Sequence, residues 1–558
     1  MTTPPASDAS TLASAERPGA GRVGTEAARR RTFAVISHPD AGKSTLTEAL
    51  ALHAKVISEA GAVHGKAGRK STVSDWMEME KARGISVSST ALQFEYAPDT
   101  VGESDTPYVV NLVDTPGHSD FSEDTYRVLT AVDAAVMLID AAKGLEPQTL
   151  KLFQVCRHRG IPVITVINKW DRPGRTPLEL LDEISERIGL TPTPLYWPVG
   201  IAGDFRGLLE RGTDGEATSY VHFTRTAGGA KIAPEEVMDA DAALAREGEE
   251  WTTATEESQL LSATGQDHDQ DEFVAGRTSP VIFASAMLNF GVRQILDTLV
   301  ALAPAPAART AVDGSERAVT DPFSAVVFKV QAGMDSAHRD RLAFMRIVSG
   351  VFERGMVVTH AQTGKPFATK YALTVFGRER TTVDDAYPGD VVGLVNANAL
   401  APGHTLYLDG KVEFPPIPSF APEFFSILRA ESAGKYKQFR KAVDQLDSEG
   451  VVQILRNDLR GDASPVMAAV GPMQFEVVAA RMKAEYGVEA RMESLPYGIA
   501  RRTDAASADE LNRQRGVEVF TRSDGVMLAL LSDKWRLQYI LKEFPELTLE
   551  PLVAGEDG

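Results

Sequence analysis

The sequence predicts three domains: an α/β domain with a mostly parallel sheet, an antiparallel β-barrel, and a ferredoxin-like α+β domain. Three observations predict this order. The 558 residues are too many for one hydrophobic core. Apolar runs alternate with helical segments up to residue 303, and beyond a Pro/Ala-rich linker the apolar residues recur at every second position. The last region then mixes both patterns.

We assign residues 31–303 to the α/β domain and interpret residues 1–30, rich in Ala, Thr, Ser and Pro, as a disordered tail. Continuous apolar runs indicate strands that are buried on both faces of a parallel sheet. Amphipathic helical segments separate most of these runs. Ligands bind such sheets at the carboxyl ends of the strands. The predicted strands are 33–37, 108–114, 134–140, 162–168 and 280–286.

The acidic charge of the chain is concentrated in one segment. The net charge of the whole chain is −19, and residues 203–276 hold 17 Asp and Glu against 5 Lys and Arg. We interpret this segment as an insertion before the last strand of the α/β domain. The overall charge argues against coating of nucleic acid by bulk attraction, and we expect no DNA partner. The remainder of the chain is close enough to neutral for local basic patches to matter.

The β-barrel is assigned to residues 311–414, after the linker at 301–310. Short segments of alternating hydrophobicity with turn residues between them, such as Pro388-Gly389-Asp390, are typical of a small antiparallel barrel. The predicted strands are 323–331, 342–348, 351–359 and 391–395.

The third domain is assigned to residues 420–558, and its predicted order is β-α-β-β-α-β, the ferredoxin-like unit. Two segments have apolar residues at helical spacing. The first helix would bury Tyr436, Phe439, Val443 and Leu446, and the second Phe475, Val478, Met482 and Tyr486.

Composition also limits where the protein acts. No apolar run approaches the roughly 18 residues of a membrane span, and the N-terminal segment lacks the apolar core of a secretion signal. The only cysteine, Cys156, excludes an intrachain disulfide. It lies in an apolar-rich helix, a position more typical of a core residue than of a nucleophile. We expect a monomer in the cytoplasm, without a membrane partner.

The stretch "SHPDAGKS" at 37–44 is nearly a phosphate-binding loop, with Ser37 at the position of the usual first glycine. Such a loop directs backbone N–H groups at phosphate oxygens from a helix N-terminus. Lys43 would reach the β- and γ-phosphates, and the Ser44 hydroxyl would bind Mg²⁺. The residues predicted to contact the nucleotide here are Ser37, His38, Pro39, Asp40, Ala41, Gly42, Lys43 and Ser44.

A second motif, "DTPGH", ends the predicted strand 108–114. Asp114 can hold Mg²⁺ through water, and Gly117 lets the backbone approach a γ-phosphate. His118 is a candidate for orienting the attacking water, against the alternative of an ordinary surface histidine. The predicted nucleotide-contacting residues are Asp114, Thr115, Pro116, Gly117 and His118.

A third motif, "NKWD" at 168–171, also follows a strand. The two carboxylate oxygens of Asp171 can accept hydrogen bonds from N1–H and the exocyclic amine of guanine, which adenine does not present. Asn168 would brace the loop, and the stem of Lys169 would lie along the purine. We add Trp170 to this group, and Ser285-Ala286, where a backbone N–H could meet the guanine O6.

Each motif has a simpler interpretation when it is taken alone, as a chance loop between strand and helix. Their common order at the ends of successive strands favours a GTP site. Two other classes remain open at this point. One is a GTP-dependent switch or scaffold without useful turnover. The other is a small-molecule kinase, which would have no need of the guanine-selective pattern of Asn168 and Asp171.

The constellation resembles the GTPase domain of the translational GTPases, the elongation-factor family, in which a Ser or Ala often stands at the first loop position. Residues 75–90 resemble its switch I segment, where Ser86 takes the place of a Mg²⁺-binding Thr. Residues 346–358 resemble the second domain of the family. The segments 33–48, 78–90 and 470–490 are most similar to its translation-termination branch.

This resemblance implies a factor that binds the ribosome after peptide release and promotes departure of a class I release factor. GTP hydrolysis would accompany its own departure. The implied partners are ribosomal RNA and proteins and class I release factors, and the implied cofactors are GTP or GDP and Mg²⁺. One feature of the sequence bears on ribosome contact. Lys437, Arg440 and Lys441 share a helix face that is either simply solvated or meets RNA phosphates.

Overall fold

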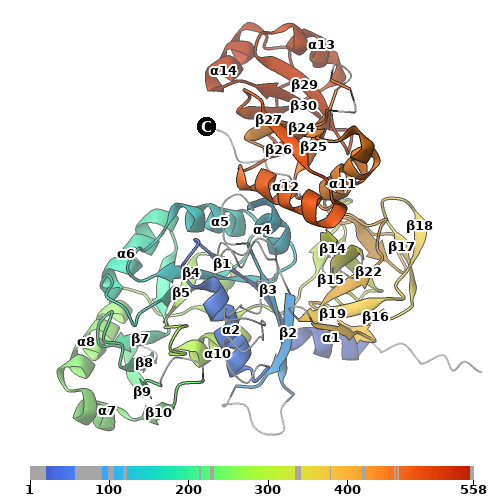
Figure 1. Ribbon diagram of the computed structural model, residues 1–558. Helices are drawn as coiled ribbons and strands as arrows, with labels where there is room; N and C mark the ends of the chain where they lie inside the picture. The colour runs from blue at the N-terminus through green and yellow to red at the C-terminus, as the bar shows by residue number, and fades with distance from the viewer. Residues whose placement is uncertain are drawn as a thin grey trace, which may run out of the picture.

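The computed structural model describes three domains that contact one another (Figure 1). The described residues are 20–56, 91–98, 106–116, 122–212, 215–226, 231–332, 341–376, 379–417, 421–457, 460–461 and 464–552. Within this part of the chain, no helix combines the length and the apolar character needed to cross a membrane. Cys156 is fully buried, and burial raises the pKa of its thiol to about 12, as expected of a core residue.

The first domain is built on a seven-stranded sheet in the order β2-β3-β1-β4-β5-β11-β6. Only β2 runs antiparallel to its neighbour, which confirms the predicted mostly parallel sheet. The strands are β1 (Arg30–Ser37), β2 (Ala91–Tyr96), β3 (Tyr108–Asp114), β4 (Ala134–Asp140), β5 (Val163–Asn168), β6 (Thr191–Pro194) and β11 (Thr278–Phe283). Strands β2 and β6 were not predicted.

Every residue of β1, β4, β5 and β11 is buried, because helices cover both faces of this sheet. One core cluster joins the sheet to α4 (Ser122–Leu129), α5 (Pro147–His158) and α6 (Pro177–Ile188). The other joins it to α2 (Lys43–His53) and α10 (Val292–Leu302). A short helix, α1 (Ala20–Ala28), buries Val23 and Ala27 and precedes β1, so the prediction of a disordered tail was wrong for residues 20–30.

The acidic segment and the preceding strand β7 (Tyr196–Val199) form an antiparallel sheet with helices packed on it, at the end of the domain remote from the barrel (Figure 1). Apolar residues of this sheet and its helices extend the core of the first domain: Trp197, Tyr220 and Trp251 are all buried. The other elements are β8 (Gly207–Arg211), β9 (Ala217–Phe223), β10 (Glu235–Met238), α7 (Ala240–Glu247), α8 (Glu249–Ala263) and α9 (Gln270–Val274).

The second domain is an antiparallel sheet in the order β18-β17-β23-β14-β15-β22-β19-β20. No pairing joins β18 to β20 among the described residues, so the barrel is an open one. The strands are β14 (Ser324–Ala332), β15 (Arg341–Ser349), β17 (Val357–His360), β18 (Lys365–Ala368), β19 (Ala372–Phe376), β20 (Glu379–Thr382), β22 (Val391–Val395) and β23 (Thr405–Tyr407). Two short pairs accompany them: β12 (Arg309–Thr310) with β13 (Glu316–Arg317), and β16 (Phe352–Glu353) with β21 (Asp385–Ala386).

The prediction of one strand over 351–359 was wrong. Gly355 adopts a φ of 90°, a left-handed conformation that ends the strand. Strands β16 and β17 therefore lie on either side of it and pair with different partners, β21 and β18.

The third domain has the sheet order β27-β24-β26-β25-β29-β30-β28. The first four strands, with α11 (Tyr436–Ser448) and α12 (Met473–Tyr486), form the predicted ferredoxin-like unit. Phe439, Val443 and Leu446 are buried as expected, whereas Tyr436 is 38% exposed. These four strands are β24 (Phe424–Ala430), β25 (Gln453–Arg456), β26 (Val466–Ala469) and β27 (Ala490–Ser494).

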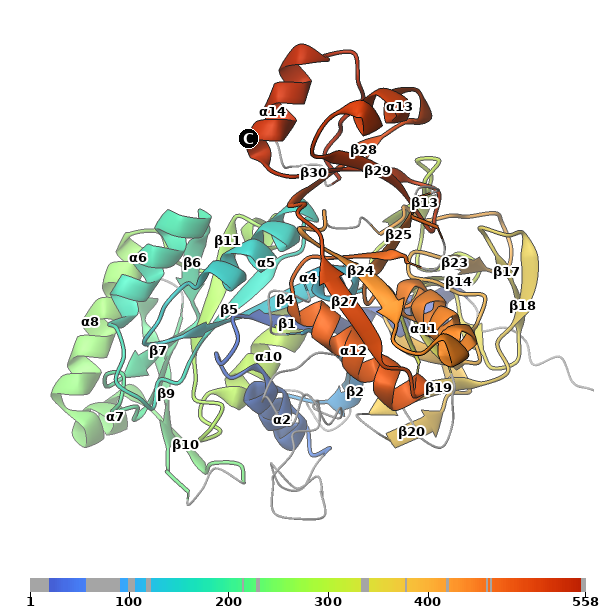
Figure 2. The ribbon, with the colours of Figure 1, turned by 45° about the horizontal axis from the view of Figure 1, so that its top comes forward.

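A second unit that was not predicted extends this sheet. Helices α13 and α14 share one core cluster with its strands. It lies at the end of the molecule farthest from the first domain (Figures 1 and 2). Its elements are β28 (Ile499–Thr503), α13 (Ala505–Arg513), β29 (Val517–Arg522), β30 (Met527–Leu531) and α14 (Lys534–Glu543).

Helix α4 contacts both other domains. Lys329 of β14 pairs with Asp124 at 3.2 Å. Arg127 binds Glu123 at 2.8 Å and donates to the Gly450 carbonyl, just beyond α11, at 3.1 Å. Gly450 has a φ of 73°, which favours glycine, and a Cβ there would lie 2.3 Å from that guanidinium and displace it. The helix after the 114–118 motif is thus held by the barrel and by the third domain.

Candidate functional site

The loop between β1 and α2 has the geometry of an anion cradle. Asp40 and Gly42 adopt φ angles of 66° and 100°, and Ala41 N donates to the His38 carbonyl at 3.3 Å. Helix α2 then begins at Lys43 with no acidic side chain in its first turn. The positive end of the helix dipole is therefore open to an anion.

Ser37 is the last residue of β1, is 1% exposed, and does not have a positive φ. An extended backbone tolerates any side chain, so the position does not need glycine. In the described part of the chain its hydroxyl makes no hydrogen bond. Within that part, Ser37 fits the turn without adding a polar contact.

The phosphate side of the site, which we define as residues 37–44 and Asp114, is organised by an ion pair. Lys43 Nζ lies 2.6 Å from Asp114 Oδ1, and these side chains are 6% and 0% exposed. Thr115 N also donates to this carboxylate at 3.0 Å, and Thr115 Oγ1 donates to the Val35 carbonyl at 2.6 Å. The two motifs meet because β1 and β3 are parallel neighbours.

The base side, which we define as Asn168, Lys169, Asp171, Ser285 and Ala286, is joined to the phosphate loop by hydrogen bonds. Asn168 Nδ2 donates to the Ala41 carbonyl at 2.9 Å, and its Oδ1 accepts from Ala286 N at 3.0 Å. A Cβ at position 42 would lie 2.4 Å from Asn168 Nδ2. Gly42 is therefore required by this close approach as well as by its φ.

Lys169 is held across the same junction. Its Nζ donates to Asp140 Oδ2 at 2.7 Å and to the Asp40 carbonyl. Burial alone would raise the pKa of Asp140, but the bond from Lys169 and the backbone N–H of Ala142 lower it below its ordinary value. Asp140 was missed in the sequence, although its place at the end of a buried strand was a signal.

Asp171 is positioned by a hydroxyl: Ser285 Oγ donates to its Oδ1 at 2.6 Å. Ser285 is itself fixed, since its backbone exchanges two hydrogen bonds of 3.0 Å with Phe290. Trp170 is fully buried, with its ring edge-on to Phe283 at 4.7 Å. Its side chain anchors the loop in the core, so the surface of the loop is formed by the neighbouring residues.

The structure thus brings together the residues from 37–44, 114–116, 168–171 and 285–286 at one edge of the sheet. Gly117, His118 and Ser86 lie outside the described residues. The oxygen donors that are described, the Ser44 hydroxyl and the buried Asp114 carboxylate, are of the type that Mg²⁺ prefers. No cluster of three or more His, Cys, Asp or Glu suited to a metal occurs in the described part.

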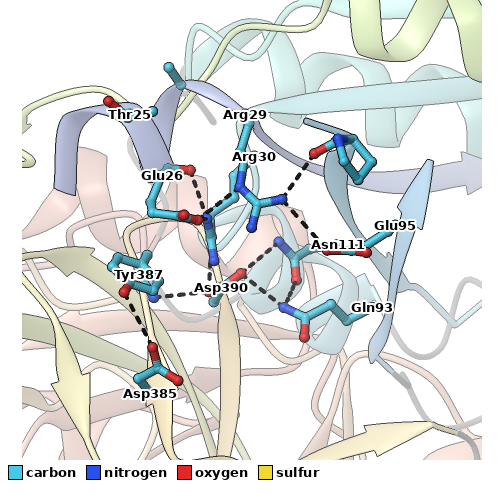
Figure 3. A network of polar contacts seen from close by, with 12 residues as sticks. Thr25, Glu26, Arg29, Arg30, Gln93, Glu95, Asn111, Asp385, Tyr387 and Asp390 are labelled. Carbon is cyan, nitrogen blue, oxygen red and sulfur yellow. Dashed lines mark hydrogen bonds and ion pairs between the residues drawn. The ribbon is translucent and has the colours of Figure 1, made fainter. Parts of the chain in front are cut away.

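The strands that carry the site are tied to the barrel by a buried polar network centred on Asp390 (Figure 3). Arg30 of β1 pairs with Asp390 at 2.9 Å, and Gln93 of β2 donates to it at 2.9 Å. Asn111 of β3 donates at 3.4 Å. Because β1 and β3 end in the phosphate loop and Asp114, this network fixes the barrel against the strands that position the site.

Three family models match successive parts of the chain. The Elongation factor Tu GTP binding domain matches residues 28–305. Elongation factor G domain 2 matches residues 322–409. The model of the class II release factor RF3, C-terminal domain, matches residues 414–541.

Whole-chain comparisons agree with these matches. The chain is 44% identical over 540 residues to a peptide chain release factor 3 of Microcystis aeruginosa, covering 95% of this chain and 96% of the relative. It is 44% identical over 535 residues to that of Gloeobacter violaceus, covering 94% and 98%. A crystal structure of a Thermus thermophilus protein shares the fold with a TM-score of 0.64 at 20% identity, covering 89% of this chain and 71% of that one.

Proposed function

This chain belongs to the peptide chain release factor 3 family and is a translational GTPase of termination, and we propose that it promotes dissociation of class I release factors from the ribosome after peptide release. GTP hydrolysis would then recycle the factor. The observation that carries the site assignment is the hydrogen-bonded junction of Asn168, Ala41 and Ala286. It joins a guanine-selective loop to a phosphate loop.

We assign nucleotide binding to both sides of the site. Asp171 accepts hydrogen bonds from N1–H and the exocyclic amine of guanine, and Ser285 orients its carboxylate. The backbone amides of residues 38–44 bind the phosphates, and Lys43 turns from Asp114 to the β- and γ-phosphates. His118, which directly follows the glycine assigned to the γ-phosphate, would orient the attacking water.

Ser44 and Asp114 are the described residues that would hold Mg²⁺, and Ser86 would join them from outside the described part. When bound, the ion would neutralise the negative charge that develops on the phosphates during hydrolysis. The residues around it would bind the phosphates.

Turnover measured under three conditions tests the function. GTP hydrolysis is followed with the protein alone, with vacant ribosomes, and with termination complexes that carry a class I release factor. Release of a labelled release factor is recorded in parallel. We expect slow basal turnover, stimulation by ribosomes, and GTP-dependent release of the factor. Turnover without any release of the factor would contradict the termination step and leave the GTPase assignment standing.

His118→Ala separates binding from chemistry. The variant should bind GTP normally and hydrolyse it at least about 100-fold more slowly, because the water is no longer oriented. Normal ribosome-stimulated turnover would remove His118 from the mechanism.

The basic face of α11 is the proposed contact with ribosomal RNA. Lys437, Arg440 and Lys441 are exposed, and the helix has no acidic residue in its first turn. Lys437 lies in the first turn of α11, where a cation opposes the helix dipole, so helix stability does not explain it. Reversing all three charges should weaken ribosome binding more than about tenfold and spare GTP binding. Lys483→Glu, at a 70% exposed lysine of α12, is the matched control.

We further propose that the protein works as a monomer in the cytoplasm. Sedimentation of the purified protein with and without GTP tests the oligomeric state.

A further inference from the structure

Helix α14 presents two aromatic side chains to solvent. Trp535 is 83% exposed and Tyr539 is 49% exposed, whereas Leu537 and Ile540 of the same helix are buried in the core. The core of the unit from β28 to α14 is therefore filled without Trp535 and Tyr539. Residues four apart in a helix lie on the same face, so Trp535 and Tyr539 are exposed on one side of α14.

Cations surround this surface. Lys534, Arg536 and Lys542 lie on α14 against one acid, Glu543, in a protein whose net charge is −19. The Arg536 guanidinium lies over the Tyr539 ring at 5.0 Å. The nearby Asp533 carboxylate accepts from Arg536 N at 2.8 Å and from Ser532 Oγ at 3.0 Å, and is thus engaged in capping the helix.

The position of α14 leaves this face available. Both views place it at the far end of the third domain, away from the first domain and the barrel (Figures 1 and 2). Single exposed apolar residues are common on protein surfaces and need no explanation. Two neighbouring aromatic rings with cations around them form instead the combination that binds unpaired nucleic acid, by stacking of bases and pairing with phosphates.

We propose that α14 is a binding surface for an unpaired segment of RNA. Bases stack on Trp535 and Tyr539, and Lys534, Arg536 and Lys542 contact phosphates. The source of that RNA, the ribosome, rests on the proposed function. This surface is distinct from the basic face of α11, which carries its cations on the ferredoxin-like unit.

Tryptophan fluorescence gives a direct test. Trp170, Trp197 and Trp251 are at most 4% exposed, so Trp535 is the accessible reporter among the described tryptophans. Titration with a single-stranded oligoribonucleotide of mixed sequence at low salt should quench the emission. Trp535→Phe should abolish that change while keeping most of the affinity. Subtracting the fluorescence change of this variant from that of the wild-type protein also removes any contribution of Trp76, which lies outside the described residues.

Affinity variants test the contacts. Trp535→Ala and Tyr539→Ala should each weaken oligoribonucleotide binding about tenfold. Leu541→Ala, at a 46% exposed non-aromatic residue of the same helix, is the matched control and should leave it unchanged. Lys534→Gln combined with Lys542→Gln should lower the slope of log affinity against log salt by about 1.4, since each lost phosphate contact in a single strand removes about 0.7.

Vacant ribosomes complete the design. Quenching by ribosomes and by free RNA, both lost with the aromatic variants, supports the proposal. Ribosome-stimulated GTP turnover with no quenching by either would overturn it and leave the proposed function intact. Quenching by ribosomes alone, reproduced by isolated ribosomal proteins, would overturn it in favour of a protein partner. Absence of stimulation in the wild-type chain would count against the proposed function, while the oligoribonucleotide titration would still decide the surface.

Discussion

The two sides of the candidate site are held in different ways. On the base side, protein groups hold each other by hydrogen bonds: Asn168 bridges Ala41 and Ala286, and Ser285 donates to Asp171. On the phosphate side, Lys43 and Asp114, the groups assigned to phosphate and Mg²⁺, hold each other at 2.6 Å. Preorganised groups lose little entropy on binding. We therefore expect phosphate binding to separate an ion pair, a step that reading of the base by Asp171 does not require.

The largest effect should come from Asp171→Asn on the base side. An amide replaces one carboxylate acceptor with a donor, which matches the C2 carbonyl of xanthine and opposes the amine of guanine. The ratio of affinities for xanthosine and guanosine triphosphates should rise about 1,000-fold or more, because a buried site rejects ligands that leave its polar groups unpaired. Competition binding measures this ratio. An unchanged ratio would show that Asp171 does not read the base.

Asn168→Ala should weaken the junction between the two sides. It removes hydrogen bonds of 2.9 Å and 3.0 Å and leaves a buried carbonyl and a buried N–H without these partners. Each such group costs about 1–3 kcal/mol, so we expect GTP and GDP affinities to fall together by about 100-fold. Titration with fluorescent GDP and GTP checks the result. A loss confined to GTP would place Asn168 on the phosphate side.

Ser285→Ala is a smaller change on the base side. The lost hydrogen bond to a charged acceptor is worth about 1.5 kcal/mol, which corresponds to about a tenfold loss of GDP affinity. Ser279→Ala is the matched control, because Ser279 is also a fully buried serine of this segment but donates to the Val163 carbonyl, away from the site. Equal losses in both variants would indicate a general effect on β11 and its flanking loop.

The smallest effect is expected for Ser37→Gly on the phosphate side. Ser37 has an extended backbone, so restoring the usual glycine gains nothing in geometry and costs about 0.5–1 kcal/mol of stability through chain entropy. GTP affinity should stay within about twofold, and urea unfolding should show a slight loss of stability. A gain of affinity beyond tenfold would mean that the serine constrains the loop.

Local patterns in the sequence predicted much of the fold. Apolar runs located β1, β3, β4, β5 and β11, and helical spacing located α11 and α12. The short strands β2, β6 and β7 and the whole unit from 499 to 543 escaped prediction, because short or charged segments carry weak periodicity. Tyr436 was expected in the core, but it lies at the first turn of α11, where no neighbour covers it fully.

By itself, the sequence determined the chemistry available to each loop, since Gly42, Lys43 and Ser44 are adjacent in the chain. Only the tertiary structure decided how the loops combine. Asn168 meets Ala41 across 127 positions, and Ser285 meets Asp171 across 114. The physical reason is that strand order sets these contacts: β1 lies beside β3 and β4, and β5 beside β11. Pairing between distant strands leaves no periodic trace in either strand, so the arrangement of the site emerges only when the sheet is assembled.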